Sequence, residues 1–166
     1  MIRCILKLLN KKSKMKNLQM DDATARKIYP TAAPELKLIL EDTFGKAFFS
    51  QDITDRVRTM EDVYRESGKT YADIAKVGDT PDEIGYKKAK LIMKVMNEDW
   101  VADYDNDKQT KYELRWIKNK NGRFSFHCCT GWTTDASAGA RLVARSGKIA
   151  EHIGKYFENE FNEFLV

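Results

Sequence analysis

The sequence has few cysteines, and their arrangement does not suggest disulfide bonds. Its 166 residues include three cysteines, of which Cys128 and Cys129 are adjacent. An odd number with an adjacent pair does not form the framework of bridges that stabilises small secreted proteins. We therefore expect a cytoplasmic protein whose stability comes from a hydrophobic core.

Long apolar runs and common catalytic motifs are also absent. No stretch approaches the ~20 apolar residues of a membrane span. The sequence contains no G-x-S-x-G, H-E-x-x-H, P-loop or G-x-G-x-x-G motif. We expect no membrane span and no cofactor, and the sequence favours a protein that is not an enzyme.

Positive charge is concentrated near the N-terminus. The chain has 29 Lys and Arg against 25 Asp and Glu. Residues 1–20 hold six basic residues and no acidic one, which leaves 23 basic and 25 acidic residues in 21–166. We expect 1–20 to be a basic leader, either disordered or upstream of a start at Met15. Residues 21–166 should fold as one α+β domain, with a helical half over 21–99 and a sheet plus C-terminal helix over 100–166.

Capping signals in the first half predict several short helices. The signals are Asp21 or Asp22 and the pair Thr59 and Asp62 as N-terminal caps, Pro34 as a first-turn residue, and Gly45 as a stop. The helix over 35–43 should place Leu36, Ile39 and Leu40 on one side.

The strongest local signal is the segment Thr80–Glu83, with sequence TPDE. It combines a hydroxyl cap, proline at the first helical position and acidic residues in the first turn. A helix should begin there and continue to about Asn97. On the side opposite its apolar stripe lie Lys87, Lys90 and Lys94, a ridge that could contact phosphate or form a solvated helix face.

An alternating apolar pattern after Trp100 predicts a β-hairpin. A three-residue loop, Lys120–Gly122, pairs Trp116 with Phe126 and Leu114 with Cys128. A two-residue loop would put the apolar residues of the two strands on opposite faces, so we predict the first register.

A third strand over 141–145 and a final helix complete the predicted fold. Ser146 caps this helix, whose apolar stripe from Ile149 to Phe164 needs a sheet face to cover. The predicted fold class is α+β, with a small three-stranded antiparallel sheet covered on one face by helices and a helical N-terminal half.

Four stretches resemble a known group of proteins: TARKIYPTAAPELKLILEDTFG, DITDRVRTMEDV, DEIGYKKAKLIMKVMNEDW and RLVARSGKIAEHIGKYFENEF. They are similar to short uncharacterised proteins common in Bacteroidetes phages and prophages. The resemblance covers most of the chain after Leu18. It implies an accessory phage-type protein inside a bacterial cell, and it implies no activity, ligand or catalytic residue.

The aspartates at 103, 105 and 107 alternate like the first ligands of a calcium loop. Lys108 stands where such a loop has glycine, and Leu114 where it has a bidentate glutamate. A polar turn is the simpler interpretation. A metal-binding protein or metal-assisted hydrolase that uses Asp103, Asp105 and Asp107 is an alternative hypothesis.

The cysteines and histidines give a weaker chemical signal. His127, Cys128, Cys129 and His152 carry zinc-type ligand atoms, but they lack the C-x₂₋₄-C spacing of zinc sites. Adjacent strand residues also point to opposite faces. A Cys129 nucleophile with His152 as its base is a further alternative, although nothing near it in the sequence lowers the thiol pKa.

The predicted register leaves basic side chains on the sheet face opposite the core: Arg115, Arg123, His127, Arg141 and Arg145. Trp132, placed in a loop after the hairpin, could stack on a base, anchor a protein contact or cover the core. We predict a non-enzymatic protein that binds an anionic partner, nucleic acid or an acidic host protein, through this face. A merely solvated surface, and an inhibitor that contacts a host protein, are the alternatives.

Overall fold

The structure is a computed structural model that describes residues 20–98, 100–136 and 141–165. In chain order the elements are α1 (Asp22–Ile28), η1, a 3-10 turn (Tyr29–Thr31), α2 (Pro34–Phe44), α3 (Lys46–Ser50), α4 (Ile53–Arg56), α5 (Met60–Ser67), α6 (Tyr71–Ile74), α7 (Pro81–Asn97), β1 (Lys111–Lys118), β2 (Phe124–Trp132), β3 (Val143–Ala144), α8 (Gly147–Tyr156) and α9 (Glu158–Leu165). The helical first half and the antiparallel sheet confirm the predicted α+β class.

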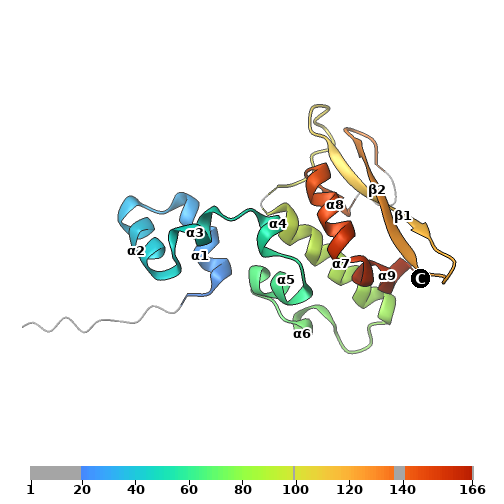
Figure 1. The fold of residues 1–166 in the computed structure, drawn as a ribbon, viewed down its shortest axis with the longest axis horizontal. Coiled ribbons are helices and arrows are strands. Elements are labelled where there is room, and N and C mark those ends of the chain that lie inside the picture. The colour runs from blue at the N-terminus through green and yellow to red at the C-terminus, as the bar shows by residue number, and fades with distance from the viewer. Residues whose placement is uncertain (1–19, 99, 137–140, 166) are drawn as a thin grey trace, which may run out of the picture.

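The elements form a main body and a small helical group beside it. Helices α1, α2 and α3 lie at one end of the molecule, and the β1–β2 hairpin lies at the other (Figure 1). Helix α7 runs through the body, where it contacts α5, α8 and α9. The helical group has its own aromatic cluster, in which Tyr29 stacks on Phe49 at 4.0 Å and Phe44 on Phe48 at 5.1 Å between ring centroids.

The helix signals in the sequence are confirmed by the caps. Asp21 accepts a hydrogen bond from the Thr24 N–H at 2.7 Å at the start of α1. A capping box joins Thr59 to Asp62, and Glu83 accepts from the Thr80 N–H at 2.8 Å before α7. These side chains satisfy backbone donors that the first turn of a helix leaves free.

Helices α8 and α9 cover one face of the sheet, whose strand order is β2-β1-β3. The core at this interface is aromatic. Trp116 stacks on Phe161 at 4.9 Å and meets Phe126 edge-on at 5.8 Å. Phe157 is fully buried at the junction of the two helices. The prediction that the last helical segment covers the aromatic side of the hairpin is confirmed.

The hairpin turns through the predicted three-residue loop. Asn119 N donates to Arg123 O at 2.7 Å, and Gly122 N donates to Asn119 O at 3.1 Å. Gly122 has φ 81°, a left-handed conformation that favours glycine in this loop. The predicted pairing of Trp116 with Phe126 is confirmed.

The second predicted pair of the hairpin is wrong because β2 contains a bulge. The register shifts between Arg115 and Trp116, so that Leu114 lies opposite Cys129 instead of Cys128. One extra residue in β2 exchanges the faces of all that follow it. Cys128 is therefore exposed and Cys129 packs against the core, whereas the predicted pairing of Leu114 with Cys128 places Cys128 on the core side.

Side chains from helices pair with both edges of the sheet. At the β2 edge, Asn162 Nδ2 donates to Phe124 O at 2.6 Å, and Phe124 N donates to Asn162 Oδ1 at 2.7 Å. At the β3 edge, Asn97 Nδ2 donates to Val143 O at 2.8 Å, and its Oδ1 accepts from Arg145 N at 2.9 Å. Both amides thereby replace a neighbouring strand, which leaves these edge groups satisfied.

Three further expectations need correction. The final helix is divided at Phe157 into α8 and α9. The third strand is shorter than 141–145, since β3 spans only Val143–Ala144. Ile39 does not join the buried side of α2, because its side chain is 61% exposed. Expectations about residues 1–19 lie outside the described residues.

Gly154 allows α8 to approach the sheet, which gives a first prediction. A Cβ at this position would lie 2.2 Å from Cγ of Phe126. We expect Gly154→Ala to lower the free energy of unfolding by about 1–2 kcal/mol, because overpacking outweighs the gain in helix propensity. Gly147→Ala is the control, because a Cβ there meets its nearest side-chain atom at 3.6 Å. Urea denaturation measures both, and equal stabilities of the two variants would contradict this packing.

Candidate anion-binding site

The exposed part of the predicted basic face lies around the bulge of β2. Arg115 lies opposite Cys128, and the bulge leaves both His127 and Cys128 exposed. Arg141 is exposed at the start of the segment that leads to β3. All three basic residues are exposed, and their predicted role in binding stays a prediction.

Two other arginines of the predicted face have partners outside it. The Arg123 guanidinium donates to Asn159 Oδ1 of α9 at 3.0 Å. Arg145 Nη2 lies 2.6 Å from the Glu98 carboxylate, just after α7. Glu98 neutralises Arg145, whereas Asn159 is uncharged and only holds the Arg123 guanidinium against α9.

Trp132 is the last residue of β2 rather than a loop residue. It lies opposite Lys111 in the sheet and is half-buried. Its indole Nε1 is buried and has no hydrogen-bond partner among the described residues. A half-buried ring at a strand end offers only part of its surface for stacking.

Lys111 is fully buried on the face of the sheet opposite the helices. Its side chain is 0% exposed. The ammonium donates to Asp103 O, to Asn106 O at 3.3 Å and to Thr133 O at 2.7 Å. The Tyr104 ring lies 5.1 Å from the same nitrogen. Through these hydrogen bonds, the buried Lys111 side chain on β1 holds the loop that precedes this strand.

This arrangement bears on the calcium-like aspartates. Two of the backbone carbonyls in the loop already accept from the Lys111 ammonium. Asp103 Oδ1 accepts from Asp105 N at 3.1 Å, which is an ordinary Asx turn. Among the described residues, no group of three His, Cys, Asp or Glu side chains is placed to hold a metal ion.

Cys129 and His152 lie in different environments. Burial raises the pKa of the Cys129 thiol, which disfavours the nucleophilic thiolate. The His152 Nε2 atom lies 2.6 Å from Val57 O, and its ring packs on Tyr156 at 4.5 Å. The structure therefore gives no support to the alternative in which His152 activates Cys129.

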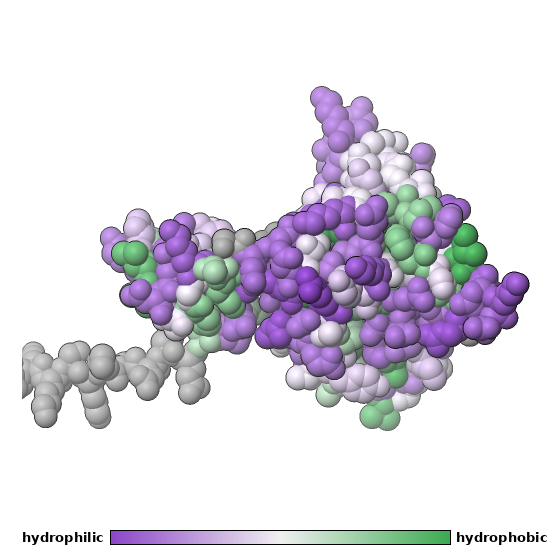
Figure 2. Space-filling model, in the orientation of Figure 1, coloured by the Kyte–Doolittle hydropathy of each residue, from purple (hydrophilic) through white to green (hydrophobic). Residues whose placement is uncertain are grey.

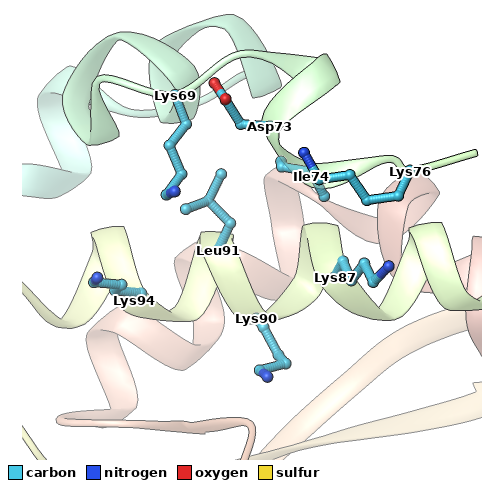
Figure 3. A pocket seen from close by; sticks show the side chains of 8 residues that line it. All are labelled: Lys69, Asp73, Ile74, Lys76, Lys87, Lys90, Leu91 and Lys94. Atoms are coloured by element: carbon cyan, nitrogen blue, oxygen red, sulfur yellow. The ribbon is translucent and has the colours of Figure 1, made fainter.

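A different basic site lies where α6 crosses α7. Side chains from both helices and the flanking loops line a hollow of about 380 Å³: Lys69, Asp73, Ile74, Lys76, Lys87, Lys90, Leu91 and Lys94 (Figure 3). Leu91 points from α7 toward α6, and Lys69 extends beside it. Five lysines and one aspartate thus line an open depression, and Lys90 leaves α7 on the side opposite Leu91 (Figure 3). We call this site the lysine hollow.

Most lysines of the lysine hollow lack an acidic partner. Lys87 Nζ lies 2.7 Å from Asp79, and Lys76 Nζ donates to Ala72 O at 2.9 Å. Among the described residues, no carboxylate lies within 4.0 Å of the ammonium groups of Lys69, Lys90 and Lys94. Asp73 lines the same site: its carboxylate accepts from the Thr70 N–H at 2.8 Å, which lowers the pKa of Asp73, and the charges of Lys69 and Lys76 lower it further.

A groove continues from the lysine hollow toward α1. It is open to solvent, has a volume of about 630 Å³, and shares Lys69, Leu91 and Lys94 with the lysine hollow. Its other basic lining residues are Arg26, Lys27 and Arg56. The face of the molecule drawn in Figure 2 is mainly hydrophilic where the body meets the N-terminal helices.

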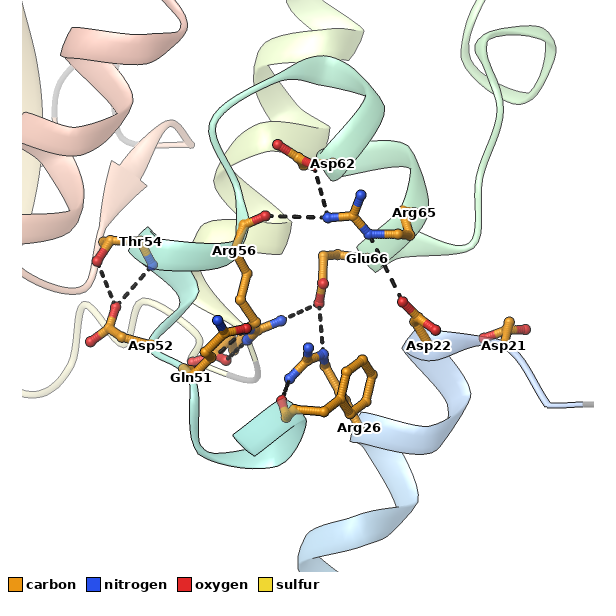
Figure 4. A network of polar contacts seen from close by, with 12 residues as sticks. Asp21, Asp22, Arg26, Gln51, Asp52, Thr54, Arg56, Asp62, Arg65 and Glu66 are labelled. Atoms are coloured by element: carbon orange, nitrogen blue, oxygen red, sulfur yellow. Dashed lines mark hydrogen bonds and ion pairs between the residues drawn. The ribbon is translucent and has the colours of Figure 1, made fainter. Parts of the chain in front are cut away.

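The arginines in the groove are held by a chain of ion pairs. Glu66 lies between the guanidinium groups of Arg26 and Arg56, 3.5 Å from Arg26 Nε (Figure 4). Arg56 in turn lies 3.0 Å from Glu98, which also binds Arg145. These arginines therefore fix the N-terminal helices to the body, and the unpaired lysines are the cations that remain for a ligand.

The sequence predicts the lysines that α7 contributes to this site, but not the other two. The spacing of Lys87, Lys90 and Lys94 predicts a ridge on one helix face, and the structure has it. Lys69 and Lys76 join the ridge only because α6 packs across α7 through Ile74 and Leu91. No local pattern in the sequence predicts that contact.

Comparisons with family models, curated proteins and solved structures found no match. None of the helices within the described ranges has the length and apolar character that crossing a membrane requires.

Lys111 gives a second prediction. In Lys111→Met, three backbone carbonyls lose their donor in a buried site, and we expect the free energy of unfolding to fall by about 2–3 kcal/mol. Lys118→Met, on an exposed part of the same strand, should change it by less than about 0.5 kcal/mol. Chemical denaturation at pH 7 measures both, and a Lys111→Met variant as stable as Lys118→Met would contradict the role of the ammonium.

His152 gives a third prediction. Burial lowers the pKa of this imidazole below its usual value of about 6.5. The folded state therefore prefers neutral His152, so its contribution to stability is present above about pH 6.5 and is lost as the pH falls through the folded-state pKa. Acidification from pH 7.5 to 5 should destabilise the wild type more than His152→Gln. Urea midpoints at both pH values measure this, and parallel losses would contradict it.

Proposed function

We propose that this protein binds the phosphate backbone of nucleic acid through the lysine hollow. The observation that carries the proposal is the gathering of five lysines around one concavity, with three of them lacking any described carboxylate partner. Residues 21–166 have slightly more acidic than basic side chains. The local excess of positive charge is therefore a property of this surface and not of the whole body.

The shape of the site supports a polymer of phosphates as the ligand. Lys87 and Lys94 are two turns apart on α7, about 10 Å along its axis. Lysine supplies a flexible point charge, which suits contacts with a charged backbone that are independent of base sequence. The groove toward α1 extends the concave surface beyond a single phosphate.

The sheet face with Arg115, His127 and Arg141 stays the surface that the sequence predicts. Its acidic-host-protein partner, the accessory phage-type role and a cytoplasmic location also stay predictions. The lysine hollow is the better-supported site, because its five lysines line one depression, whereas Arg123 and Arg145 of the sheet face are held by Asn159 and Glu98 outside that face.

The fourth prediction tests which surface binds. In Lys69→Gln/Lys94→Gln, the affinity for a fluorescein-labelled oligonucleotide should fall about tenfold or more at low salt. The slope of log K against log NaCl concentration should become shallower by about 1–2, because each lysine–phosphate contact contributes about 1. Fluorescence anisotropy over a range of salt concentrations measures both quantities.

Two matched variants complete this experiment. Lys108→Gln/Lys120→Gln removes the same charge from exposed positions outside the lysine hollow. Because only the net charge of the protein changes, its affinity for the oligonucleotide should fall by no more than about twofold. Arg115→Gln/Arg141→Gln removes it from the sheet face. Loss of binding in this last variant alone would assign the site to the sheet. Absence of binding by the wild type at low salt would overturn the proposal.

A further inference from the structure

The N-terminal helical group, made of α1, α2 and α3, has an aromatic core of its own. The rings of Tyr29, Phe44, Phe48 and Phe49 pack on one another within it. The hydrophobic core of the body begins at Ile53 and, among the described residues, includes no side chain of α1, α2 or α3. The group lies at one end of the molecule (Figure 1), and apolar burial stabilises the group and the body separately.

Ion pairs hold the N-terminal helical group against the body. The Arg26 guanidinium of α1 lies 3.5 Å from the centroid of the Phe48 ring, and its Nε lies 3.5 Å from the Glu66 carboxylate of α5. A second, longer pair joins Asp22 of α1 to Arg65 of α5 at 4.0 Å. Figure 4 shows both pairs between α1 and the body. Arg26 thus contacts the aromatic core of its own group and a carboxylate of the body at the same time.

Glu66 balances two cations in a site that excludes most water. Its side chain is 7% exposed, and it also pairs with Arg56, whose side chain is 6% exposed. Arg56 has a second carboxylate partner in Glu98, whereas Glu66 supplies the one carboxylate of the described residues within 4.0 Å of Arg26. Burial lowers the pKa of Arg26, and the charge of Arg56 lowers it further. Without the Glu66 charge, the two guanidinium groups would repel each other where solvent screens them little.

We propose that the N-terminal helical group is a hinged unit, held to the body by Glu66 and able to rotate away from it without unfolding. We call the contacts of Arg26, Glu66 and Arg56 the ionic latch. The hinge is Gln51, an exposed residue with extended backbone between α3 and α4. Its carbonyl accepts from Arg56 Nε at 3.2 Å, so the ionic latch also holds the hinge. Asp52, the next residue, belongs to the body, because it caps α4 and accepts from the Thr54 N–H at 2.9 Å. Hinges of this kind need only a few residues at the end of an element.

The ionic latch also determines the groove beside the lysine hollow. Helix α1 contributes Ala23, Thr24 and Lys27 to the lining of this groove, and the body contributes Lys69 and Lys94. Lys27 lines the same groove as the two body lysines only while the N-terminal helical group is docked. The hinged unit therefore sets how far the basic surface extends, and this inference holds whether or not nucleic acid is the ligand.

The fifth prediction concerns the relative orientation of the two parts. Backbone N–H residual dipolar couplings are measured by NMR in the full chain, for the wild type, Glu66→Gln and Arg26→Gln. We expect one alignment tensor to fit the couplings of α1 to α9 in the wild type. In both variants the couplings of α1, α2 and α3 should lose this common alignment and need a second, smaller tensor, because the N-terminal helical group then reorients relative to the body. The amide shifts within α2 should stay those of the folded group.

The two variants and two controls separate the ionic latch from a general effect of charge. Arg26→Gln keeps the pair of Glu66 with Arg56, so it opens the latch without leaving a buried cation of the body unpaired. It decides the question if Glu66→Gln fails to fold. Lys27→Gln on α1 and Glu61→Gln on α5 remove the same charges from exposed positions next to the latch. Both controls should keep a single tensor.

Each other result contradicts a definite part of the inference. A single tensor in Arg26→Gln would overturn the ionic latch, and two tensors in the wild type would overturn the docking of the group. Loss of the native amide shifts of α2 in the variants, with those of the body unchanged, would overturn the independent stability of the group. These results do not bear on binding by the lysine hollow, which the oligonucleotide titrations test separately.

Discussion

The amphipathic packing of α7 is the constraint on which the rest of the structure depends. Ala89, Ile92 and Met96 are fully buried between α5, α8 and α9. This burial fixes the rotation of the helix about its axis, so the lysines of its opposite side must face outward. The lysine hollow forms because α6 packs on α7 through Ile74 and Leu91, beside these lysines. A rotation of α7 would bury ammonium groups, which is costly without partners.

Close backbone approach makes the packing around α7 specific. At Gly85, a Cβ would lie 2.7 Å from Cβ of Glu163 and 2.9 Å from its backbone carbonyl carbon. Helix α9 can therefore lie against α7 only where a side chain is absent. The same helix then covers the sheet with Phe161 and pairs with the β2 edge through Asn162. A single helix pair thus links the lysine side of the molecule to the hairpin side.

The sequence predicted local structure well where caps and periodicity decide it. The starts of α1, α5 and α7 follow from their capping residues, and the hairpin loop follows from Gly122. The bulge in β2 was not predictable, because a period-two pattern carries no sign of an extra residue between Phe126 and Cys129. The buried Lys111 was also missed, because a lysine in a strand ordinarily indicates an exposed face.

The candidate site shows the same limit. Its α7 lysines are visible in the sequence, whereas the contribution of Lys69 depends on a tertiary contact between two helices. The sheet face has fewer free arginines than the sequence indicates, because the partners of Arg123 and Arg145 come from segments distant in sequence. Whether a basic residue is available to a ligand is decided by such partners, and a single sequence does not contain them.

The most direct test of the account is the reactivity of individual lysines in the intact chain. An amine-acetylating reagent is applied with and without saturating oligothymidylate, and each site is quantified by mass spectrometry. The account predicts strong protection at Lys69 and Lys94 and unchanged reactivity at Lys118 and Lys120 of the hairpin. Protection confined to the hairpin lysines, with Lys69 and Lys94 unaffected, would contradict it.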